Sequence, residues 1–379
     1  MSGGGSKGIA LSDRQRIAWL RLIRSDNVGP ATFRDLINHC GSAEAALAML
    51  PELSARGGRL SQIRVATVAE AEDELERASR HGARFIGIGE PDYPPLLRQV
   101  DQAPPLLAVK GNAGVFRAPA VAMVGARNAS MAGIKLTRQI AATLSSNGYA
   151  IVSGLARGID KAAHEASLAG GTIAALAGGL DKPYPPENLD LLAAIESGRG
   201  AAVSEMPFGW EPRARDFPRR NRLIAGLAYG VVVVEAAERS GSLITARLAG
   251  EANRLVFAVP GSPLDPRSAG TNRLLKQGAI VVTDAADVLD AVRPLEGKPV
   301  FAPERLLEPD FSDPGAPPAD SDRERIVELL GPTPTDIDDI IRHTSLRPAQ
   351  VFLVLLELDL AGRLERHSGG RVSLVSLDP

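Results

Sequence analysis

The sequence predicts an α/β protein whose central domain is a doubly wound, mostly parallel sheet. Three observations lead to this fold class. Between residues 119 and 292, short β-rich runs alternate with stretches long enough for crossover helices. The runs are almost continuously apolar, which is typical of parallel strands covered by helices on both faces. The chain has 379 residues, too many for one ordinary core, so further domains are expected at its ends.

The N-terminal part of the chain has a helical pattern. Residues 1–10 are rich in Gly and Ser and are expected to be disordered. Over residues 11–83 the apolar positions have helical spacing, and a turn at Gly29-Pro30 separates two helical segments. This order resembles a SAM-like or helix-hairpin-helix domain. Such domains often contact the DNA backbone, but many only pack against other parts of a protein, and we favour packing here.

The central domain is expected to cover residues 84–292. It begins with a proline-rich, extended lead-in over residues 84–118. Seven predicted strands follow, at 120–124, 149–153, 172–177, 201–205, 230–235, 255–260 and 279–283. In open α/β sheets, ligands bind beyond the carboxyl ends of the strands. The turns that follow these strands are therefore where a binding site is expected.

The C-terminal part of the chain predicts a linker and a small third domain. Residues 293–321 contain seven prolines and little periodicity, which is typical of a linker. Residues 322–379 predict three helices (322–330, 335–342 and 348–360) and then a β-hairpin, an order that suggests a winged helix. This domain has seven arginines against ten acidic residues, a net charge of −3. It lacks the basic surplus of a duplex-reading domain, so contact with protein is at least as well supported as contact with DNA.

The composition excludes several classes of protein. One cysteine, Cys40, excludes an internal disulfide and a cysteine-rich metal site, and no metal site is expected. The first residues lack the apolar core of a signal peptide, and no apolar run approaches the roughly 18–20 residues that span a bilayer. We therefore expect a cytoplasmic protein without a membrane span.

Four turns that follow predicted strands are suited to binding anions. They read "VGARNASMAG", "SGLARGID", "EAAERSGSLITA" and "PGSPLDPRSAGTN", after the first, second, fifth and sixth strands. Glycine lets the backbone approach a ligand, and the first N–H groups of a helix favour an anion. Strand-to-helix turns need glycine in any case. Four such turns together, two of them carrying Arg127 and Arg157, favour anion binding.

Specific missing residues argue against NAD and ATP as the anion, and no cofactor is expected. In the first turn, Arg127 stands where a dinucleotide-binding fingerprint has its second glycine. The second strand ends in Ser153-Gly154, without the acidic residue that would bind a ribose. A Walker A loop with its Gly-Lys-Ser/Thr is also absent from the sequence.

A dense cationic segment precedes the fifth strand, in a chain whose net charge is only −2. The segment "EPRARDFPRRNRLIAG", residues 211–226, carries Arg213, Arg215, Arg219, Arg220 and Arg222. Arginines near a helix start gain nothing from the helix dipole, whereas their planar guanidinium groups suit phosphate. Some could instead pair with Asp216, Glu205 or Glu235, and Arg222 is the best candidate for such a structural role.

A long, discontinuous row of cations suits a polyanion better than a mononucleotide. Phosphate contacts add affinity through counterion release, with a salt slope of about −0.7 per phosphate for single strands. Stacking on bases would need aromatic side chains, which form only 4% of the chain. Phe208, Trp210 and Phe217 flank the arginines and are the candidate stacking residues.

Eight motifs follow one another between roughly residues 90 and 283. They are "YPPLL…APPLLAVKG", "VGARNAS", "SGLARGID", "YPPEN", "SEMPFG", "FPRRNRLIAG", "VVVEAAERSGSLITA" and "VPG…GTN". In this order they resemble the DprA/Smf DNA-processing family. The helical N-terminal domain and the winged-helix-like domain resemble that family's optional flanking domains.

The resemblance implies an extended Rossmann-like domain that binds single-stranded DNA and has no catalytic residues. It further implies that the protein protects incoming DNA during natural transformation, loads the RecA recombinase, and forms a homodimer through the Rossmann-like domain. The nucleic-acid-binding residues predicted on this sequence are Gly125, Arg127, Ser130, Ser153, Gly154, Arg157, Gly158, Lys182, Arg219, Arg220, Asn221, Arg222, Ser240, Gly241, Ser242 and Thr245. Two positions depart from the family pattern: Ala126 replaces a common Ser, and Pro186 replaces a residue that is basic in some members.

Two other functions are left open by the sequence. A nucleotide-processing, phosphoribohydrolase-like enzyme is the first, because "PGS…GTN" is reminiscent of loops in related folds that cleave nucleotides. Such an enzyme needs a positioned acid or base, for which Glu235 is the best candidate, although it could equally cap a helix or pair with an arginine. His164 is expected to be packed or exposed rather than catalytic. A transcription regulator acting through the winged helix is the second, and the charge of that domain weakens it.

Overall fold

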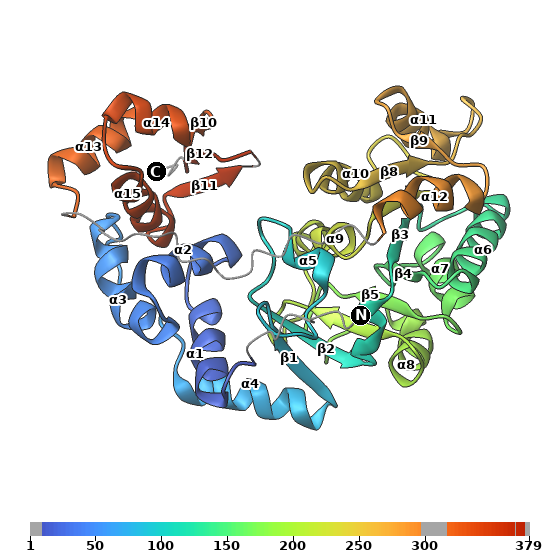
Figure 1. Ribbon diagram of the computed structural model, residues 1–379, viewed down its shortest axis with the longest axis horizontal. Helices are drawn as coiled ribbons and strands as arrows, with labels where there is room; N and C mark the ends of the chain where they lie inside the picture. The colour runs from blue at the N-terminus through green and yellow to red at the C-terminus, as the bar shows by residue number, and fades with distance from the viewer. Residues whose placement is uncertain (1–9, 297–316, 368, 376–379) are drawn as a thin grey trace, which may run out of the picture. The chain divides into compact units, whose positions relative to one another are not determined.

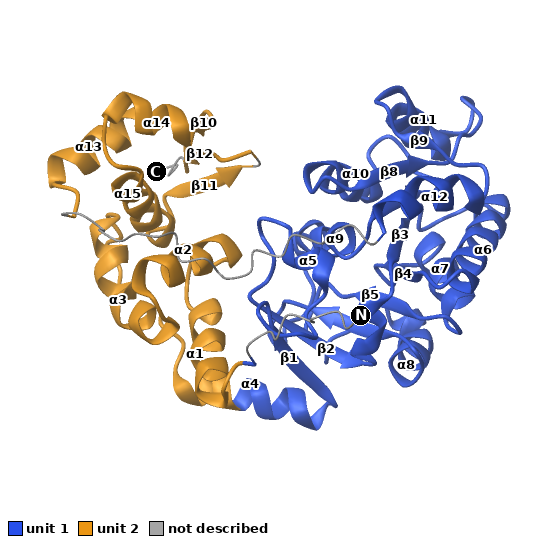
Figure 2. Ribbon diagram, viewed as in Figure 1, with its two compact units in different colours: residues 1–10, 73–302 blue, residues 11–72, 303–379 orange. Residues whose placement is uncertain are grey.

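The structure, a computed structural model, describes residues 10–296, 317–367 and 369–375. The predicted disorder at residues 1–10, Ala10 aside, and most of the predicted linker at 293–321 therefore lie outside the described residues. The chain forms two compact units (Figure 2). The first unit consists of residues 1–10 and 73–302, and the second joins residues 11–72 to residues 303–379. The second unit is thus built from both ends of the chain.

The first unit contains a nine-stranded sheet with the order β1-β2-β6-β5-β4-β3-β7-β8-β9. Figure 1 labels β1 to β5, β8 and β9 of this sheet. The strands are Ala83–Gly87 (β1), Leu106–Gly111 (β2), Ala120–Val124 (β3), Ala150–Ser153 (β4), Thr172–Ala175 (β5), Ala201–Ser204 (β6), Gly230–Val233 (β7), Leu255–Ala258 (β8) and Ile280–Val281 (β9). Strands β3 to β9 correspond to the seven predicted strands, and neighbouring members of this set pair in parallel. The prediction of a mostly parallel sheet is confirmed.

Two antiparallel strands extend the sheet beyond the predicted seven. Strand β2 pairs antiparallel with β6, with Ala108 opposite Ser204, and β1 pairs antiparallel with β2. Both strands lie in the segment that the sequence predicted only as an extended lead-in. Pro104 and Pro105 stand immediately before β2 and Pro94 and Pro95 follow β1, so turn residues dominate the local pattern.

Helices cover both faces of the sheet, as the apolar strands predicted. Alternate residues of β3 contribute to two different cores, because successive side chains of a strand point to opposite faces. Val121 and Met123 pack with helices α6, α7 and α12, whereas Ala122 and Val124 pack with α9 and α10. The helices of this unit are α4 (Val68–Arg80) from Asp73 onward, α5 (Pro95–Arg98), α6 (Met131–Ser146), α7 (Ile159–Ser167), α8 (Leu189–Ser197), α9 (Asp216–Gly226), α10 (Gly241–Glu251), α11 (Ala269–Lys276) and α12 (Ala285–Val292). Short 3₁₀ turns are Ala113–Arg117, Pro186–Asn188, Pro266–Ser268 and Arg293–Leu295.

The strand order reverses at β3, which pairs with β4 on one side and β7 on the other. From β3 the chain proceeds through β4, β5 and β6 in one direction, and later returns to β7, β8 and β9 in the other. In open α/β sheets a ligand crevice forms at such a reversal. The turns after β3, β4 and β5 therefore lie next to one another at the edge of the sheet where the parallel strands end.

The second unit combines helices from the N-terminal part with a winged helix from the C-terminal part. Its elements are α1 (Asp13–Arg24), α2 (Pro30–Cys40), α3 (Ala43–Arg56) and the start of α4 (Val68–Arg80), followed by α13 (Asp320–Leu329), β10 (Thr335–Asp336), α14 (Ile337–Thr344), α15 (Pro348–Leu360), β11 (Leu364–His367) and β12 (Arg371–Leu374). Helix α2 begins at Pro30, directly after the predicted turn, and its C-cap is Gly41 with φ of 77°. The small sheet has the order β10-β12-β11, and β10 was not predicted because it has only two residues.

Within the described ranges, no helix is both long and apolar enough to cross a bilayer. In the same ranges there is no group of three or more His, Cys, Asp or Glu side chains arranged to hold a metal ion.

Candidate nucleic-acid interface

A small pocket lies at the carboxyl edge of the sheet and draws residues from four separate segments. It is lined by Arg127 after β3, by Gly154, Ala156 and Arg157 after β4, by Tyr184 and Pro185 after β5, and by Phe217 and Arg220 of α9. The structure thus brings together three of the predicted arginines and one predicted aromatic residue. Because parallel strands end at the same edge, turns distant in sequence meet here.

Arg220 forms the floor of this pocket rather than part of its outer surface. The residue is only 6% exposed, and its Nη1 donates hydrogen bonds to the carbonyl oxygens of Gly154 at 2.6 Å and Ala175 at 2.5 Å. Burial lowers the pKa of Arg220 to about 10, with Asp160 opposing this effect and Arg127 adding to it. The guanidinium is therefore charged at neutral pH, and its buried Nε has no hydrogen-bond partner among the described residues.

Asp160 fixes the backbone of the turn after β4, which lines the pocket. Its Oδ2 accepts hydrogen bonds from the backbone N–H groups of Gly154 at 3.1 Å and Ala156 at 3.3 Å. Burial raises the pKa of Asp160, while the charge of Arg220 and these N–H groups act in the opposite direction. The carboxylate thereby connects the shape of the turn to the position of the buried arginine.

Two glycines of the turn after β4 allow close approaches that a side chain would prevent. A Cβ atom at Gly158 would lie 2.2 Å from the carbonyl oxygen of Ala126, and the residue has a φ of 75°. At Gly154, a Cβ atom would lie 2.5 Å from Nη1 of Arg220. The first glycine joins the turns after β3 and β4, and the second admits the guanidinium group.

Aromatic and cationic side chains alternate at the mouth of the pocket. The ring of Phe217 meets two guanidinium groups, with its centroid 5.5 Å from Cζ of Arg127 and 5.9 Å from Cζ of Arg220. Tyr184 meets the same ring edge-on, with 5.8 Å between centroids, and is 48% exposed. An exposed ring beside fixed cations suits a ligand that has both flat faces and negative charge.

Three predicted cations, Arg157 of the pocket together with Lys182 and Arg219, each have an acidic neighbour. Arg157 lies 3.8 Å from Glu187, Lys182 lies 3.5 Å from Glu211, and Arg219 lies 3.1 Å from Glu205. Arg157 and Lys182 have exposed side chains and exposed partners. Exposed ion pairs contribute little to stability, so phosphate can replace these carboxylates at low cost.

Arg222 has the structural role that the sequence analysis considered for it. Its guanidinium forms an ion pair with Glu205 and donates to the carbonyl oxygen of Gln102, and its side chain is only 12% exposed. Burial lowers the pKa of Arg222, against the effect of Glu205. The side chain packs inside the unit, so it does not fit the predicted role in DNA contact.

Glu235 occupies the N-terminus of α6, at the reversal of the strand order. Its Oε2 accepts from the backbone N–H of Ser130 at 2.9 Å, and its Oε1 accepts from the hydroxyl of Ser130 at 2.5 Å. In dinucleotide-binding folds, phosphate takes this place at the first helix. A carboxylate of the protein stands there instead, and its contacts with Ser130 give Glu235 the helix-capping role that the sequence analysis considered.

The remaining predicted contacts are already engaged within the protein. Ser153 donates to the carbonyl oxygen of Met123, Ser240 caps α10 by accepting from Ser242 N–H, and Asn221 donates to the carbonyl oxygen of Gly241. Ser242 and Thr245 are buried in α10, and Gly125 lies against Ile159. These residues shape the edge of the sheet, while the exposed cations carry the charge.

The three candidate stacking residues are placed differently. Phe208 is 5% exposed and packs edge-on against Phe85 and His81, so it does not fit a stacking role. Trp210 is partly exposed, lies under Arg213 with 4.8 Å from Cζ to the ring centroid, and donates to Asp216 at 2.9 Å. Phe217 faces the pocket. A stacking role for Trp210 and Phe217 stays a prediction.

Family models match nearly the whole chain. The model for DNA recombination-mediator protein A matches residues 84–293, the DprA-like N-terminal HHH domain matches residues 13–77, and the DprA winged helix domain matches residues 311–370. This chain belongs to the DprA/Smf family. The match over the sheet domain alone covers more than half of the chain.

Relatives and solved structures agree with this assignment to the DprA/Smf family. Protein Smf of Escherichia coli is 40% identical over 303 residues, which cover 79% of this chain and 79% of that protein. The X-ray structure of DprA from Streptococcus pneumoniae has a TM-score of 0.59 and 34% identity, covering 74% of this chain and 98% of that one. A structure of DprA from Helicobacter pylori, a protein described as having a unique single-stranded DNA binding mode, has a TM-score of 0.51 and 28% identity over 56% of this chain and 96% of that one. The family is one of DNA-processing recombination mediators.

The sequence analysis did not predict a role for Tyr184, which lines the pocket, or for Asp160, which binds the turn after β4. Tyr184 was noticed only as part of the "YPPEN" motif, and Asp160 only as the last residue of "SGLARGID". Tyr184 is an exposed aromatic residue in a chain with few of them, and this scarcity could have marked it as a stacking candidate. The role of Asp160 depends on backbone contacts that residue spacing does not reveal.

Proposed function

We propose that this chain is a single-stranded DNA-binding recombination mediator and that its sheet domain carries the DNA site. The strand would follow the turns after β3, β4 and β5, with Arg127, Arg157 and Arg220 near its phosphates. Tyr184 and Phe217 would stack on its bases. The observation that carries this proposal is the pocket itself. The charged, buried guanidinium of Arg220 lines it together with the cations Arg127 and Arg157 and the aromatic side chains of Tyr184 and Phe217.

Single strands fit this site better than duplex because of the aromatic side chains. In a duplex the bases are already stacked and paired, so Tyr184 and Phe217 could reach them only after the pairing is broken. A single strand offers both a phosphate backbone and free base faces. Family membership and the single-stranded DNA binding described for the Helicobacter pylori protein support the same substrate.

Family membership also supports two further parts of the proposal. The protein would protect incoming DNA and load the RecA recombinase onto it during natural transformation, in the cytoplasm where the two meet. It would act as a homodimer formed through the Rossmann-like domain. A RecA-loading assay on DNA covered by single-strand binding protein tests the first part, and the mass of the protein by light scattering tests the second.

A titration with labelled DNA tests the central part of the proposal. An oligodeoxythymidine of about 30 nucleotides should bind at least about tenfold more tightly than a duplex of the same length. The double variant R219A/R220A should lose most of this affinity, and its unfolding transition should show that the fold is retained. Arg117→Ala is the matched control, because Arg117 is 82% exposed and precedes β3, at the opposite edge of the sheet. Equal affinity for the two DNA forms, or an unchanged double variant, would contradict the proposal.

The alternative of a nucleotide-processing hydrolase finds no support at its candidate residues. Both carboxylate oxygens of Glu235 are engaged with Ser130. His164 is fully buried, and its Nδ1 lies 2.7 Å from the hydroxyl of Thr172. Turnover of a nucleoside monophosphate that is abolished in Glu235→Gln would nevertheless favour this alternative.

A further inference from the structure

The third helix of the winged helix, α15, corresponds to the recognition helix of winged helices that read DNA. Helices α14 and α15 form a helix-turn-helix, joined by residues 345–347, and β11 and β12 form the wing. In such motifs the second helix, here α15, enters the major groove of DNA. The surroundings of α15 therefore show whether this domain can read duplex DNA.

Both faces of α15 are buried in apolar cores. Val351, Leu355 and Leu358 belong to the core of the winged helix itself. Leu356 and Leu360 belong instead to the core of the N-terminal helices, together with residues of α1, α2 and α3. From Val351 to the end of the helix only Phe352 is exposed, so the two cores cover most of the surface that a DNA groove would need.

The charges within α15, and that of Arg366 after it, are also committed to protein contacts. The helix contains no basic residue, and its two acidic residues are paired: Glu357 with both ends of the Arg323 guanidinium at 2.8 and 2.9 Å, and Asp359 with Arg366 at 2.8 Å. Arg366 reaches across to Asp35 of α2 at 2.8 Å. An acidic helix without free cations is unsuited to a phosphate backbone.

The partner surface is the hairpin between α1 and α2, the element with which helix-hairpin-helix domains contact DNA. Asn27 of this hairpin donates to the carbonyl oxygen of Leu360 at 2.9 Å, and Thr32 donates to Asp359 at 2.9 Å. Arg363, just after α15, donates to the carbonyl oxygen of Gly57 at 3.0 Å. The C-terminal end of α15 thus contacts the hairpin, and the residue Arg363 after it contacts the C-cap of α3.

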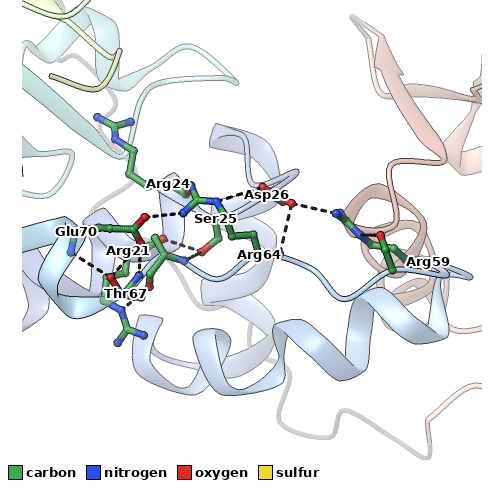
Figure 3. A network of polar contacts seen from close by, with 10 residues as sticks. Arg21, Arg24, Ser25, Asp26, Arg59, Arg64, Thr67 and Glu70 are labelled. Atoms are coloured by element: carbon green, nitrogen blue, oxygen red, sulfur yellow. Dashed lines mark hydrogen bonds and ion pairs between the residues drawn. The ribbon is translucent and has the colours of Figure 1, made fainter. Parts of the chain in front are cut away.

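Figure 3 shows that the rest of the hairpin is fixed from within the N-terminal helices. Asp26 accepts from Arg59 at 3.0 Å and from the backbone N–H of Arg64, while Arg64 also reaches Glu70 at 3.0 Å. Ser25 accepts from the N–H of Ala66 at 3.1 Å. The hairpin is a rigid support, and its polar groups are occupied by protein.

We propose that α15 is a docking helix for the N-terminal hairpin and not a DNA-reading helix. The two ends of the chain then form one folding unit. In this unit α15 covers the hairpin that a helix-hairpin-helix domain uses on DNA, and the N-terminal helices cover the helix that a winged helix uses on DNA. The partner of the winged helix is the N-terminal domain of the same chain. This inference does not depend on the DNA site of the sheet domain.

A nicked full-length chain tests the docking. A protease site is introduced between Glu296 and Asp320, the chain is cut under native conditions, and the products are separated by gel filtration at about 1 μM. The C-terminal fragment should elute with the remainder of the chain. Leu360→Arg should release it, whereas Phe352→Arg on the same helix should not, because Phe352 is 44% exposed. A fragment that elutes alone without any substitution, or is released equally by both, would overturn the proposal.

Charge reversal separates loss of docking from loss of folding. Arg366→Asp should release the fragment because it places a carboxylate beside Asp35 and Asp359. Asp35→Arg in the same chain should restore co-elution, which a merely misfolded fragment would not do. Failure of this rescue would overturn the docking geometry.

DNA titration tests the second half of the inference. Arg342 and Arg371 are exposed on the winged helix, so R342A/R371A removes cations that a DNA-reading mode would use. Affinity of the intact chain for duplex and for single strands should stay within about twofold of the unsubstituted protein. A loss of about tenfold or more for duplex would overturn the inference.

Discussion

A Cβ atom at Gly154 would lie 2.5 Å from Nη1 of Arg220, so the buried guanidinium lies directly against the backbone of the turn after β4. Gly154→Ala should push Arg220 away from the carbonyl groups that hold it. We expect affinity for single-stranded DNA to fall at least about tenfold, or about 1.4 kcal/mol, measured by fluorescence anisotropy.

Gly250→Ala is the matched control for this substitution. Gly250 lies in α10, outside the pocket and outside the predicted DNA contacts, and a Cβ atom there would meet nothing within 4 Å. Its affinity should remain within about twofold. If both alanines weakened binding equally, the contact between Gly154 and Arg220 would not be the cause.

Tyr184 should contribute through stacking rather than charge. The side chain is 48% exposed and meets Phe217 edge-on at the mouth of the pocket. Tyr184→Leu should cost about 1–3 kcal/mol of binding free energy and leave the slope of log K against log salt unchanged. A changed slope with little loss of affinity would indicate that Tyr184 acts on the phosphates instead.

Arg222 should matter for stability and not for DNA. It is paired with Glu205 inside the unit, and removing one partner leaves a buried charge with fewer contacts. Arg222→Ala should lower the free energy of unfolding by about 3 kcal/mol in a urea titration. In conditions where the variant is folded, its affinity for single strands should be unchanged. A specific loss of binding in a stable variant would return Arg222 to the DNA site.

Much of the sheet could be predicted because its strands are short apolar runs between glycine-rich turns. The runs at β3 and β7, "AVAMV" and "GVVVVE", carry no polar residue before their ends. Strands β1 and β2 could not be predicted in the same way. Their antiparallel pairing depends on β6, about a hundred residues later, and prolines stand next to both.

For the candidate site, the sequence indicated which residue types come together at the sheet edge but not how deeply each side chain is buried. Arg219 and Arg220 are neighbours in sequence, yet Arg219 is half exposed and Arg220 is buried between the turns after β4 and β5. Phe208 stands near the arginines, but its ring enters a core formed with Phe85. These differences arise from contacts between distant segments, which local spacing does not contain.

Acid should destabilise the protein through His164. Burial, together with the charge of Arg220, lowers the pKa of His164 to about 3, below its ordinary value of 6.5. The unfolded chain therefore takes up a proton that the folded chain refuses as pH falls from 6.5 toward 3, and stability is lost in this window. Between pH 7 and pH 5 the loss from this residue should be about 2 kcal/mol. His164→Gln should reduce the pH dependence of the urea midpoint, and an equally steep dependence in that variant would contradict this account.

The salt dependence of binding to single-stranded DNA is the most direct test of the phosphate site. Affinity for an oligodeoxythymidine is measured over a series of salt concentrations for the intact protein, R127A/R157A and Arg117→Ala. The double variant should lose affinity and lower the magnitude of the salt slope by about 1.4, or about 0.7 for each lost phosphate contact. Arg117→Ala should leave both values unchanged. A double variant with the slope of the intact protein would show that the DNA backbone lies elsewhere.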